Sequence, residues 1–145
     1  MVRDMIKRHE GLSLKIYYCT AGKRTIGYGW NLDAHGLPND IAAYLRMRGE
    51  IDIGMAERLL TISIASAEAD CREIYRGFEM FSERRQAALV DFLFAGARVA
   101  LSFRKMRAAI FQEDWNRAAD EMQDSKWYEQ TKGRAVELCE MVRNG

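Results

Sequence analysis

The sequence changes its hydrophobic period once, and this change limits the folds that are open to the chain. Residues 13–29 are rich in β-branched and aromatic side chains and are interrupted by glycines, a composition typical of short strands joined by turns. The remainder repeats apolar residues at helical spacing, and the 145 residues contain a single proline, Pro38, so little in it would break a helix. The sequence therefore predicts an α+β fold that is mostly α, with one small β-hairpin or sheet near the N-terminus.

Local signals predict where the first helices begin and end. Apolar residues in 1–10 recur at helical spacing, and Gly11 is well placed to end that helix. The turn of the hairpin is expected at Thr-Ala-Gly, residues 20–22. Residues 31–40 have the composition of a loop. Its last two residues are candidate N-caps for a following helix. They are Asn39 and Asp40.

Asp52 is a candidate N-cap for a longer helix that can continue to about Tyr75. Such a helix would be roughly 30 Å long at ~1.5 Å per residue. Four further helical stretches are expected, and Ser82 and Asp114 are candidate caps for two of them. The stretches cover residues 82–96, 100–112, 114–123 and 133–145.

The charges are unevenly distributed, although the formal net charge is only +1. The first 30 residues contain six Lys and Arg side chains against two Asp and Glu side chains. Positive charge around a cleft would attract an anionic polymer, such as nucleic acid or the bacterial cell wall. No nucleic-acid-binding motif is found, so we expect no nucleic-acid partner.

The three cysteines have no CxxC spacing, and the chain has only two histidines, so no metal signature is present. We expect no metal and no cofactor. Cys71 and Cys139 are predicted to be free buried thiols. The first 11 residues are charged and contain no apolar run long enough for a signal peptide or membrane anchor, so the expectation is a protein without a signal peptide.

Three side chains in the opening segment can perform chemistry. Glu10 lies at a predicted helix end beside Leu12 and Leu14, where partial burial would suit a carboxyl group to general-acid catalysis. Cys19 and Thr25 follow on the predicted strands, and the spacing of Glu, eight residues, Cys, five residues, Thr could turn all three toward one cleft. From the residues alone, a surface glutamate, a structural cysteine and a strand threonine remain open alternatives.

The segment EGLSLKIYYCTAGKRTIGYGW, residues 10–30, resembles the active-site segment of phage lysozymes of the T-even type, glycoside hydrolase family 24. The catalytic triad of that family follows the pattern Glu, eight residues, Asp or Cys, five residues, Thr, which Glu10, Cys19 and Thr25 match without a gap. The segment SKWYEQTKGRA, residues 125–135, is similar to the C-terminal motif of the same family. The resemblance spans nearly the whole chain, and in the middle it rests on pattern more than on identity.

The resemblance implies a lysozyme-like fold in which a small β-hairpin lobe is joined by a long helix to a larger helical lobe, with the active-site cleft between the lobes. The chain would be a single lysozyme domain over residues 1–145. Its β-containing lobe would span about 12–55 and the interlobe helix about 55–75. The helical lobe would span about 76–145 and include the N-terminal helix, 1–11.

Three substrate-binding residues are implied by the same resemblance, namely Trp30, Leu32 and Arg134. In the family, the arginine of the C-terminal motif approaches the catalytic glutamate from the other lobe. Burial would favour the neutral form of Glu10 and Arg134 would favour its ionised form, so geometry has to decide between them. The common histidine after G-x-G is Trp30 here, and its indole could be part of the core or a surface on which a sugar stacks.

The function implied is that of a muramidase, which hydrolyses the β-1,4 bond between N-acetylmuramic acid and N-acetylglucosamine in bacterial peptidoglycan. Glu10 would protonate the leaving glycosidic oxygen, and Thr25 would help to hold the attacking water. Cys19, if ionised, could act as a base, as a nucleophile or as a stabilising charge. Basic side chains would lower its pKa, and the candidates are Lys15, Lys23 and Arg24.

Two other functions stay open. The chain could be a peptidoglycan-binding relative that has lost hydrolysis because Cys19 replaces aspartate, or a peptidoglycan peptidase that uses Cys19 with His9 or His35. The peptidase is disfavoured because no oxyanion motif is apparent. The resemblance further implies a monomer that accumulates in the host cytoplasm and depends on a holin to permeabilise the membrane before it reaches the wall and lyses the host.

Overall fold

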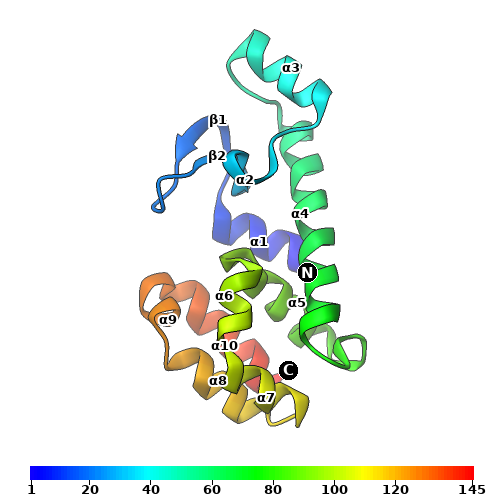
Figure 1. Cartoon of the computed structure of the whole chain (residues 1–145), viewed down its shortest axis with the longest axis vertical. Helices are drawn as coiled ribbons and strands as arrows, with labels where there is room; N and C mark the ends of the chain where they lie inside the picture. Colours follow the sequence, from blue (N-terminus) through cyan, green and yellow to red (C-terminus); the bar gives the residue numbers. More distant parts are fainter. The chain divides into compact units, whose positions relative to one another are not determined.

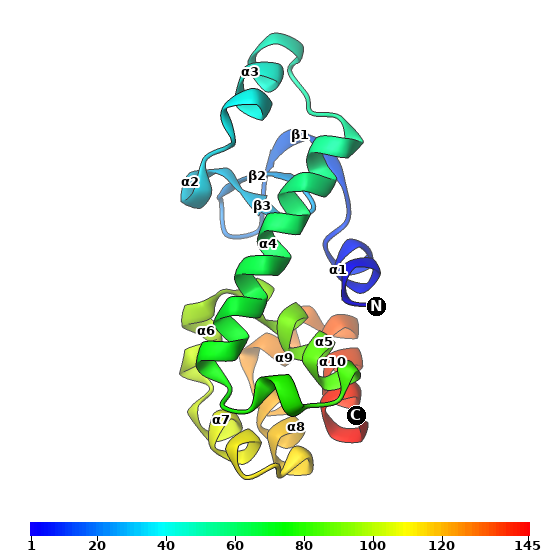
Figure 2. The same ribbon diagram turned by 90° about the vertical axis from the view of Figure 1, so that its right-hand side faces the viewer.

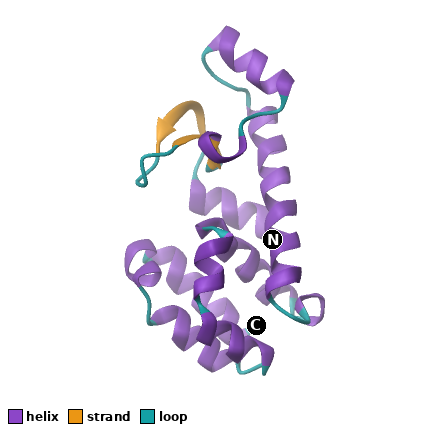
Figure 3. Cartoon of the chain, in the orientation of Figure 1, coloured by secondary structure: helices purple, strands orange, loops and turns teal.

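The computed structural model describes residues 1–145, and helices make up most of the chain (Figures 1 and 3). All strands lie in the first third of the sequence. The α+β, mostly helical fold predicted from the sequence is therefore confirmed. The chain forms two compact units. Residues 3–65 are called the sheet unit below, and residues 66–145 together with 1–2 are called the helical unit. No helix combines the length and the apolar character that are needed to cross a membrane.

The sheet unit contains one antiparallel sheet with strand order β1-β2-β3 (Figure 2). The first helix ends as predicted, because Gly11 adopts a left-handed φ of +71° and its N–H donates to the carbonyl of Lys7 at 2.9 Å. The elements of this unit are α1 (Val2–Glu10), β1 (Ser13–Tyr18), β2 (Arg24–Gly27), β3 (Trp30–Asn31), α2 (Leu32–His35), α3 (Asn39–Arg48) and the first part of α4 (Ile53–Ile74).

The turn between β1 and β2 is the predicted Thr-Ala-Gly loop. The N–H of Gly22 donates to the carbonyl of Cys19 at 2.8 Å, and Gly22 has a φ of +76°. A turn followed by a glycine in the left-handed region is a common three-residue hairpin connection. In β1, the pairing register with β2 shifts between Ser13 and Tyr17, so this strand bulges before it reaches the turn.

The core of the sheet unit lies between the sheet, α3 and the beginning of α4. Each large aliphatic side chain that is fully buried there stabilises the fold by roughly 1.5–3 kcal/mol. The buried cluster consists of Ile26, Trp30, Ile41, Ile51, Ala56 and Leu59.

The stretch predicted as a loop over 31–40 contains a short helix, α2, so that prediction is wrong for its first half. Asn31 caps this helix, because its side-chain oxygen accepts the N–H of Ala34 at 3.0 Å. Gly36 closes the helix with a φ of +62°. A cap and a terminating glycine separated by one turn were enough for a helix, although the segment is too short to show a helical period.

The predicted caps of α3 are wrong, whereas the predicted cap of α4 is confirmed. Pro38 precedes α3 and no side chain caps that end. Asp40 instead pairs with Arg58 at 2.7 Å. Asp52 accepts the N–H of Met55 at 2.7 Å, and α4 ends at Ile74, one residue before the expected position.

The helical unit is built around α5, which is largely buried. The predicted caps Ser82 and Asp114 are confirmed, since each accepts a backbone N–H at 3.2 Å from the residue three positions on. After the end of α4, the elements of this unit are η1 (Phe78–Met80), α5 (Glu83–Phe92), η2 (Leu93–Ala95), α6 (Ala97–Ser102), α7 (Arg104–Phe111), α8 (Trp115–Gln123), α9 (Lys126–Thr131) and α10 (Gly133–Asn144).

One predicted helical stretch, 100–112, is interrupted at Phe103, which separates α6 from α7. The Phe103 ring packs edge-on against Phe92 and Trp127, with centroids 5.0 and 6.4 Å away. Phe92 and Trp127 are themselves in edge-on contact at 4.8 Å. This aromatic cluster joins the residue that breaks the helix to α5 and α9, so packing outweighs local helix propensity here.

Candidate active site

Glu10 is the last residue of α1, and its carboxyl group lies against the turn between β2 and β3. A β-carbon built on Gly29 would be 2.6 Å from Oε2 of Glu10 and 3.0 Å from its Cδ, and Gly29 has a φ of +75°. Only glycine leaves room for the carboxyl group at this distance and also tolerates that backbone conformation. The Gly11 stop and the Gly29 contact together fix where the Glu10 side chain lies.

The β1–β2 hairpin places the other two predicted catalytic residues on one face. Tyr17 pairs directly with Thr25, and the N–H of Cys19 continues the ladder by donating to the carbonyl of Lys23 at 3.0 Å. Side chains alternate along a strand and opposed residues share a face. Tyr17, Cys19 and Thr25 therefore share a face, and Tyr18 is on the opposite one.

Cys19 is half-buried and its pKa is lowered from the ordinary value of 9.0. The largest cause is a hydrogen bond from the backbone N–H of Lys23, followed by one from the N–H of Ala21; the hydroxyl of Thr25 also contributes. The direction agrees with the sequence-based expectation, but its cause does not. The thiolate is favoured by amides of the hairpin loop, which stabilise negative charge as donors.

The basic side chains that were expected to lower the pKa of Cys19 are not among its main causes. One of them is directed to a different partner: Arg24 donates from Nε to Oδ1 of Asp33 at 2.8 Å, and its backbone N–H donates to Oδ2 at 2.9 Å. These bonds lower the pKa of Asp33. Arg24 thus ties β2 to α2.

Thr25 is only 4% exposed, and its hydroxyl donates to the carbonyl of Lys23 at 2.9 Å. The same hydroxyl is a hydrogen-bond partner of the Cys19 thiolate. A hydroxyl has one proton to donate, so it serves one of these two acceptors at a time. When it donates to Lys23, its oxygen can accept a hydrogen bond from Cys19 or from a water molecule.

Tyr17 was not predicted to belong to the site. Its pKa is raised, first by burial and then by the negative charges of Glu10 and of the Cys19 thiolate. The phenol therefore lies close enough to both groups to feel their charge. Its position two residues before Cys19 on the same strand is the sequence signal that identifies its face.

Trp30 and Leu32, which were predicted to bind substrate, lie in or against the core of the sheet unit. Trp30 is 7% exposed, belongs to the buried cluster and donates from its indole N–H to the carbonyl of Gly36 at 2.7 Å. Of the two roles left open for this indole, these contacts support the core role. Leu32 is half-buried and packs on the same cluster.

Arg134 lies in the helical unit, near the start of α10. Its Nε donates to Oδ1 of Asp91 at 2.7 Å, and the Asp91 side chain is 0% exposed. Asp91 comes from α5, 43 residues earlier, and no sequence pattern connects the two. A charged group this deeply buried requires an ionic or hydrogen-bonded partner, and Arg134 provides it.

The C-terminal motif has a structural basis within the helical unit. Ser125 caps α9 by accepting the N–H of Tyr128 at 3.1 Å, and it donates to the carbonyl of Met122 at 2.6 Å. Thr131 donates to the carbonyl of Trp127 at 2.7 Å. These local bonds hold α9 in place while Trp127 joins the aromatic cluster.

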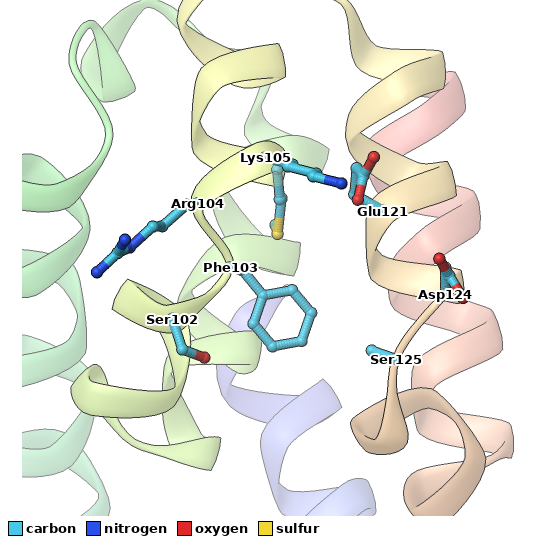
Figure 4. Close-up of a pocket in the computed structure, with 8 residues that line it drawn as sticks. Ser102, Phe103, Arg104, Lys105, Glu121, Asp124 and Ser125 are labelled. Atoms are coloured by element: carbon cyan, nitrogen blue, oxygen red, sulfur yellow. The ribbon is translucent and has the colours of Figure 1, made fainter.

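A pocket of about 360 Å³ opens where the α6–α7 and α8–α9 connections meet. Figure 4 shows the Phe103 ring in its centre and Lys105 and Glu121 projecting toward each other, while Arg104 points away. The catalytic candidates Glu10, Cys19 and Thr25 are not among its lining residues, which are Ser102, Phe103, Arg104, Lys105, Met106, Glu121, Asp124 and Ser125.

The other two cysteines are free and buried, as predicted. Burial raises the pKa of Cys71 to about 12 and that of Cys139 to about 11, the opposite direction from Cys19. No group of three or more His, Cys, Asp or Glu side chains is placed to hold a metal ion.

Comparison with known proteins identifies relatives of this chain. It is 29% identical to the pre-baseplate central spike protein of Enterobacteria phage T4 over 98% of its own length, and it spans only 27% of that protein. It is also 25% and 26% identical to the probable T4-type lysozymes 1 and 2 of Dictyostelium discoideum, with 99% of this chain and 94% of each relative covered. The family model described as phage lysozyme matches residues 7–143. Because that match includes nearly all of the chain, the protein belongs to the phage lysozyme family.

Proposed function

We propose that the protein is a muramidase that hydrolyses the β-1,4 bond between N-acetylmuramic acid and N-acetylglucosamine in peptidoglycan, with Glu10, Cys19 and Thr25 as catalytic residues. Membership of the phage lysozyme family supports a lysozyme that acts on peptidoglycan. The observation that best supports these residues is the hairpin face on which Cys19, with its lowered pKa, adjoins Thr25.

In this proposal, Glu10 is the general acid. It donates its proton to the glycosidic oxygen as the bond to the anomeric carbon breaks. Gly29 has no side chain and so leaves free the space beside the turn that the carboxyl group occupies, which supports an acid at a defined position. A fixed position matters because misplacement by about 1 Å can cost a factor on the order of 100 in rate.

Cys19 acts as a thiolate on water in this proposal. A general base works best when its pKa lies near the operating pH, and the loop amides move the pKa of Cys19 from 9.0 toward neutrality. The hydroxyl of Thr25 donates its hydrogen bond to the backbone carbonyl of Lys23. Its oxygen can therefore accept a hydrogen bond from the same water. Water that is deprotonated by Cys19 and attacks the face opposite the leaving group gives a product of inverted configuration.

The alternative roles of Cys19 give different products. A nucleophilic thiolate would form a glycosyl-enzyme and yield retention of configuration. The amide donors of Lys23 and Ala21 beside the sulfur reduce its nucleophilicity, because a thiolate of lower pKa is a weaker nucleophile. The stereochemistry of the product decides between the two roles.

The biological setting is also part of the proposal. The single lysozyme domain with the lobe bounds expected from the sequence is part of this proposal, and Arg134 would contribute to substrate binding. The protein would act as a monomer and reach the wall of the host after a holin has permeabilised the membrane. We would express the protein in cells with and without a holin. Lysis that occurs only in the cells with the holin would support this setting.

The decisive experiment is digestion of purified peptidoglycan by the wild type and by Glu10→Gln. We expect the wild type to release muropeptides with new reducing ends, and Glu10→Gln to release almost none. New free amino groups without reducing ends would instead show a peptidase. Binding to the wall without any release by the wild type would show the non-hydrolytic relative. Proton NMR of the first-formed anomer, compared with Cys19→Ser and Cys19→Asp, would separate inversion from retention.

A further inference from the structure

Tyr17 lies where the candidate catalytic groups converge, although nothing in the proposed mechanism uses it. It is directly opposite Thr25 in the β1–β2 ladder and two residues before Cys19 on the same face. Its phenol also senses the charges of Glu10 and Cys19. One side chain is thus within electrostatic range of the acid and on the same face as the groups proposed to act on water.

The hydroxyl of Tyr17 forms no hydrogen bond within the protein, and the residue is 37% exposed. The side chain is thus partly covered, and no bond within the protein occupies its hydroxyl. A phenol that is held in this way can donate one hydrogen bond and accept others.

The backbone before Tyr17 contains a bulge that affects the direction of the Tyr17 side chain. The pairing register of β1 shifts between Ser13 and Tyr17, and a bulge of this kind changes the direction in which the following side chains point. After the shift, Tyr17 and Tyr18 pair regularly with β2. The bulge therefore sets the face on which the residues after it lie, and the two-residue spacing places Tyr17, and not Tyr18, on the face of Cys19.

We propose that Tyr17 is a substrate-contacting residue of this site, whose hydroxyl donates a hydrogen bond to an oxygen of the glycan on which Glu10 and Cys19 act. The proposal rests on the muramidase function proposed above. A sugar of peptidoglycan offers hydroxyl and N-acetyl oxygens as acceptors. The phenol stays a neutral donor at the pH of the reaction, because burial and the two neighbouring acids raise its pKa.

The chain offers a closely matched control. Tyr18 is the next residue, is 71% exposed and points to the opposite face of the strand. Tyr17→Phe and Tyr18→Phe each remove one phenolic oxygen from β1 and change little else. A difference in activity between the two variants would therefore come from the face on which the lost hydroxyl lies, and not from a general change in β1.

The test measures kcat/KM on purified soluble glycan strands from peptidoglycan. A neutral hydrogen bond of ordinary strength corresponds to a loss of about 3- to 10-fold, which we expect for Tyr17→Phe with an unchanged melting temperature. Tyr18→Phe is expected to match the wild type. Equal kcat/KM values for the two variants would overturn the proposal.

A binding measurement separates this proposal from the proposed function. Calorimetry with the same glycan strands would compare Glu10→Gln with the double variant Glu10→Gln, Tyr17→Phe. We expect the double variant to bind about 3- to 10-fold more weakly, a result that does not require turnover. If the wild type failed to hydrolyse peptidoglycan, the muramidase would be refuted while this comparison still tested the contact. Equal affinities of the two proteins would refute the contact even if Tyr17→Phe lowered the rate.

Discussion

The carboxyl group of Glu10 lies so close to Gly29 that a β-carbon at position 29 would be 2.6 Å from Oε2. Gly29 belongs to the turn that joins β2 to β3, and Glu10 ends α1. The two residues are 19 positions apart in the sequence. The Glu10 carboxyl group, the proposed general acid, therefore lies directly against the backbone of this turn.

Gly29→Ala is expected to lower the hydrolytic rate on the order of 100-fold, because the methyl group must displace the Glu10 carboxyl group. Gly49→Ala is the matched control. Gly49 has a φ of +76°, nearly that of Gly29, but a β-carbon there would have nothing within 4 Å of it. Both variants share a backbone cost of roughly 1–2 kcal/mol, so rates measured at equal folded fractions isolate the contact. Equal activity of the two variants would show that Glu10 does not depend on Gly29.

The buried pair of Asp91 with Arg134 predicts a large loss of stability when one partner is removed. Asp91→Ala is expected to lower the free energy of unfolding by about 3–5 kcal/mol, because it removes the buried carboxylate that pairs with the guanidinium of Arg134. Urea denaturation measures this. The double variant Asp91→Leu, Arg134→Met removes both charges and should regain most of the loss.

Asp40→Ala serves as the control for the buried pair, since it breaks the exposed pair with Arg58. Its free energy of unfolding should stay close to that of the wild type, as is usual for exposed ion pairs. If Asp91→Ala were no less stable than Asp40→Ala, the burial of the Asp91 pair would not matter energetically.

The three thiols are predicted to react at different rates and over different pH ranges. Alkylation proceeds through the thiolate, so its rate rises with pH until the pKa is passed. The rate for Cys19 should pass its midpoint at a pH below 9.0, whereas Cys71 and Cys139 should react slowly, since burial covers them and raises their pKa values. Peptide mapping after brief treatment with iodoacetamide checks this. Preferential labelling of Cys71 or Cys139 in the folded protein would contradict it.

Replacing Thr25 tests the hydrogen bond to the thiolate. Thr25→Val removes one of the donors, so the pKa of Cys19 should rise toward its ordinary value but stay below it, because the amides of Lys23 and Ala21 remain. Thr25→Ser keeps the hydroxyl and should leave the pKa close to that of the wild type. Thiolate absorbance in the ultraviolet, measured against Cys19→Ser, follows the titration. A pKa in Thr25→Val equal to that of the wild type would exclude the hydroxyl as a donor.

The lowered pKa of Cys19 also predicts how stability changes with pH. Between the folded pKa and the ordinary value of 9.0, the unfolded chain holds the thiol proton and the folded chain does not. The stability contributed by Cys19 should therefore grow as pH rises through this window and be lost as pH falls through the folded pKa. The difference in unfolding free energy between the wild type and Cys19→Ser, measured across the window, should follow this sign.

The sequence by itself determined the features that depend on neighbours a few residues away. Gly11 ends α1, Asp52 and Ser82 cap their helices, and the Thr-Ala-Gly turn closes the hairpin. Each of these is a bond between a residue and a backbone group within four positions. Such bonds form whatever the rest of the chain does, so local composition predicts them.

Only the tertiary structure decided the features that depend on distant partners. Phe103 breaks a helical stretch because it packs on rings from α5 and α9, and Trp30 becomes a core residue because α3 and α4 cover it. Asp91 meets Arg134 across 43 positions. The spacing of Glu10, Cys19 and Thr25 was visible in the sequence, but the cause of the lowered pKa of Cys19 was not. That cause is the direction of two amide groups in the folded hairpin loop, and amide directions are set by backbone conformation rather than by side-chain identity.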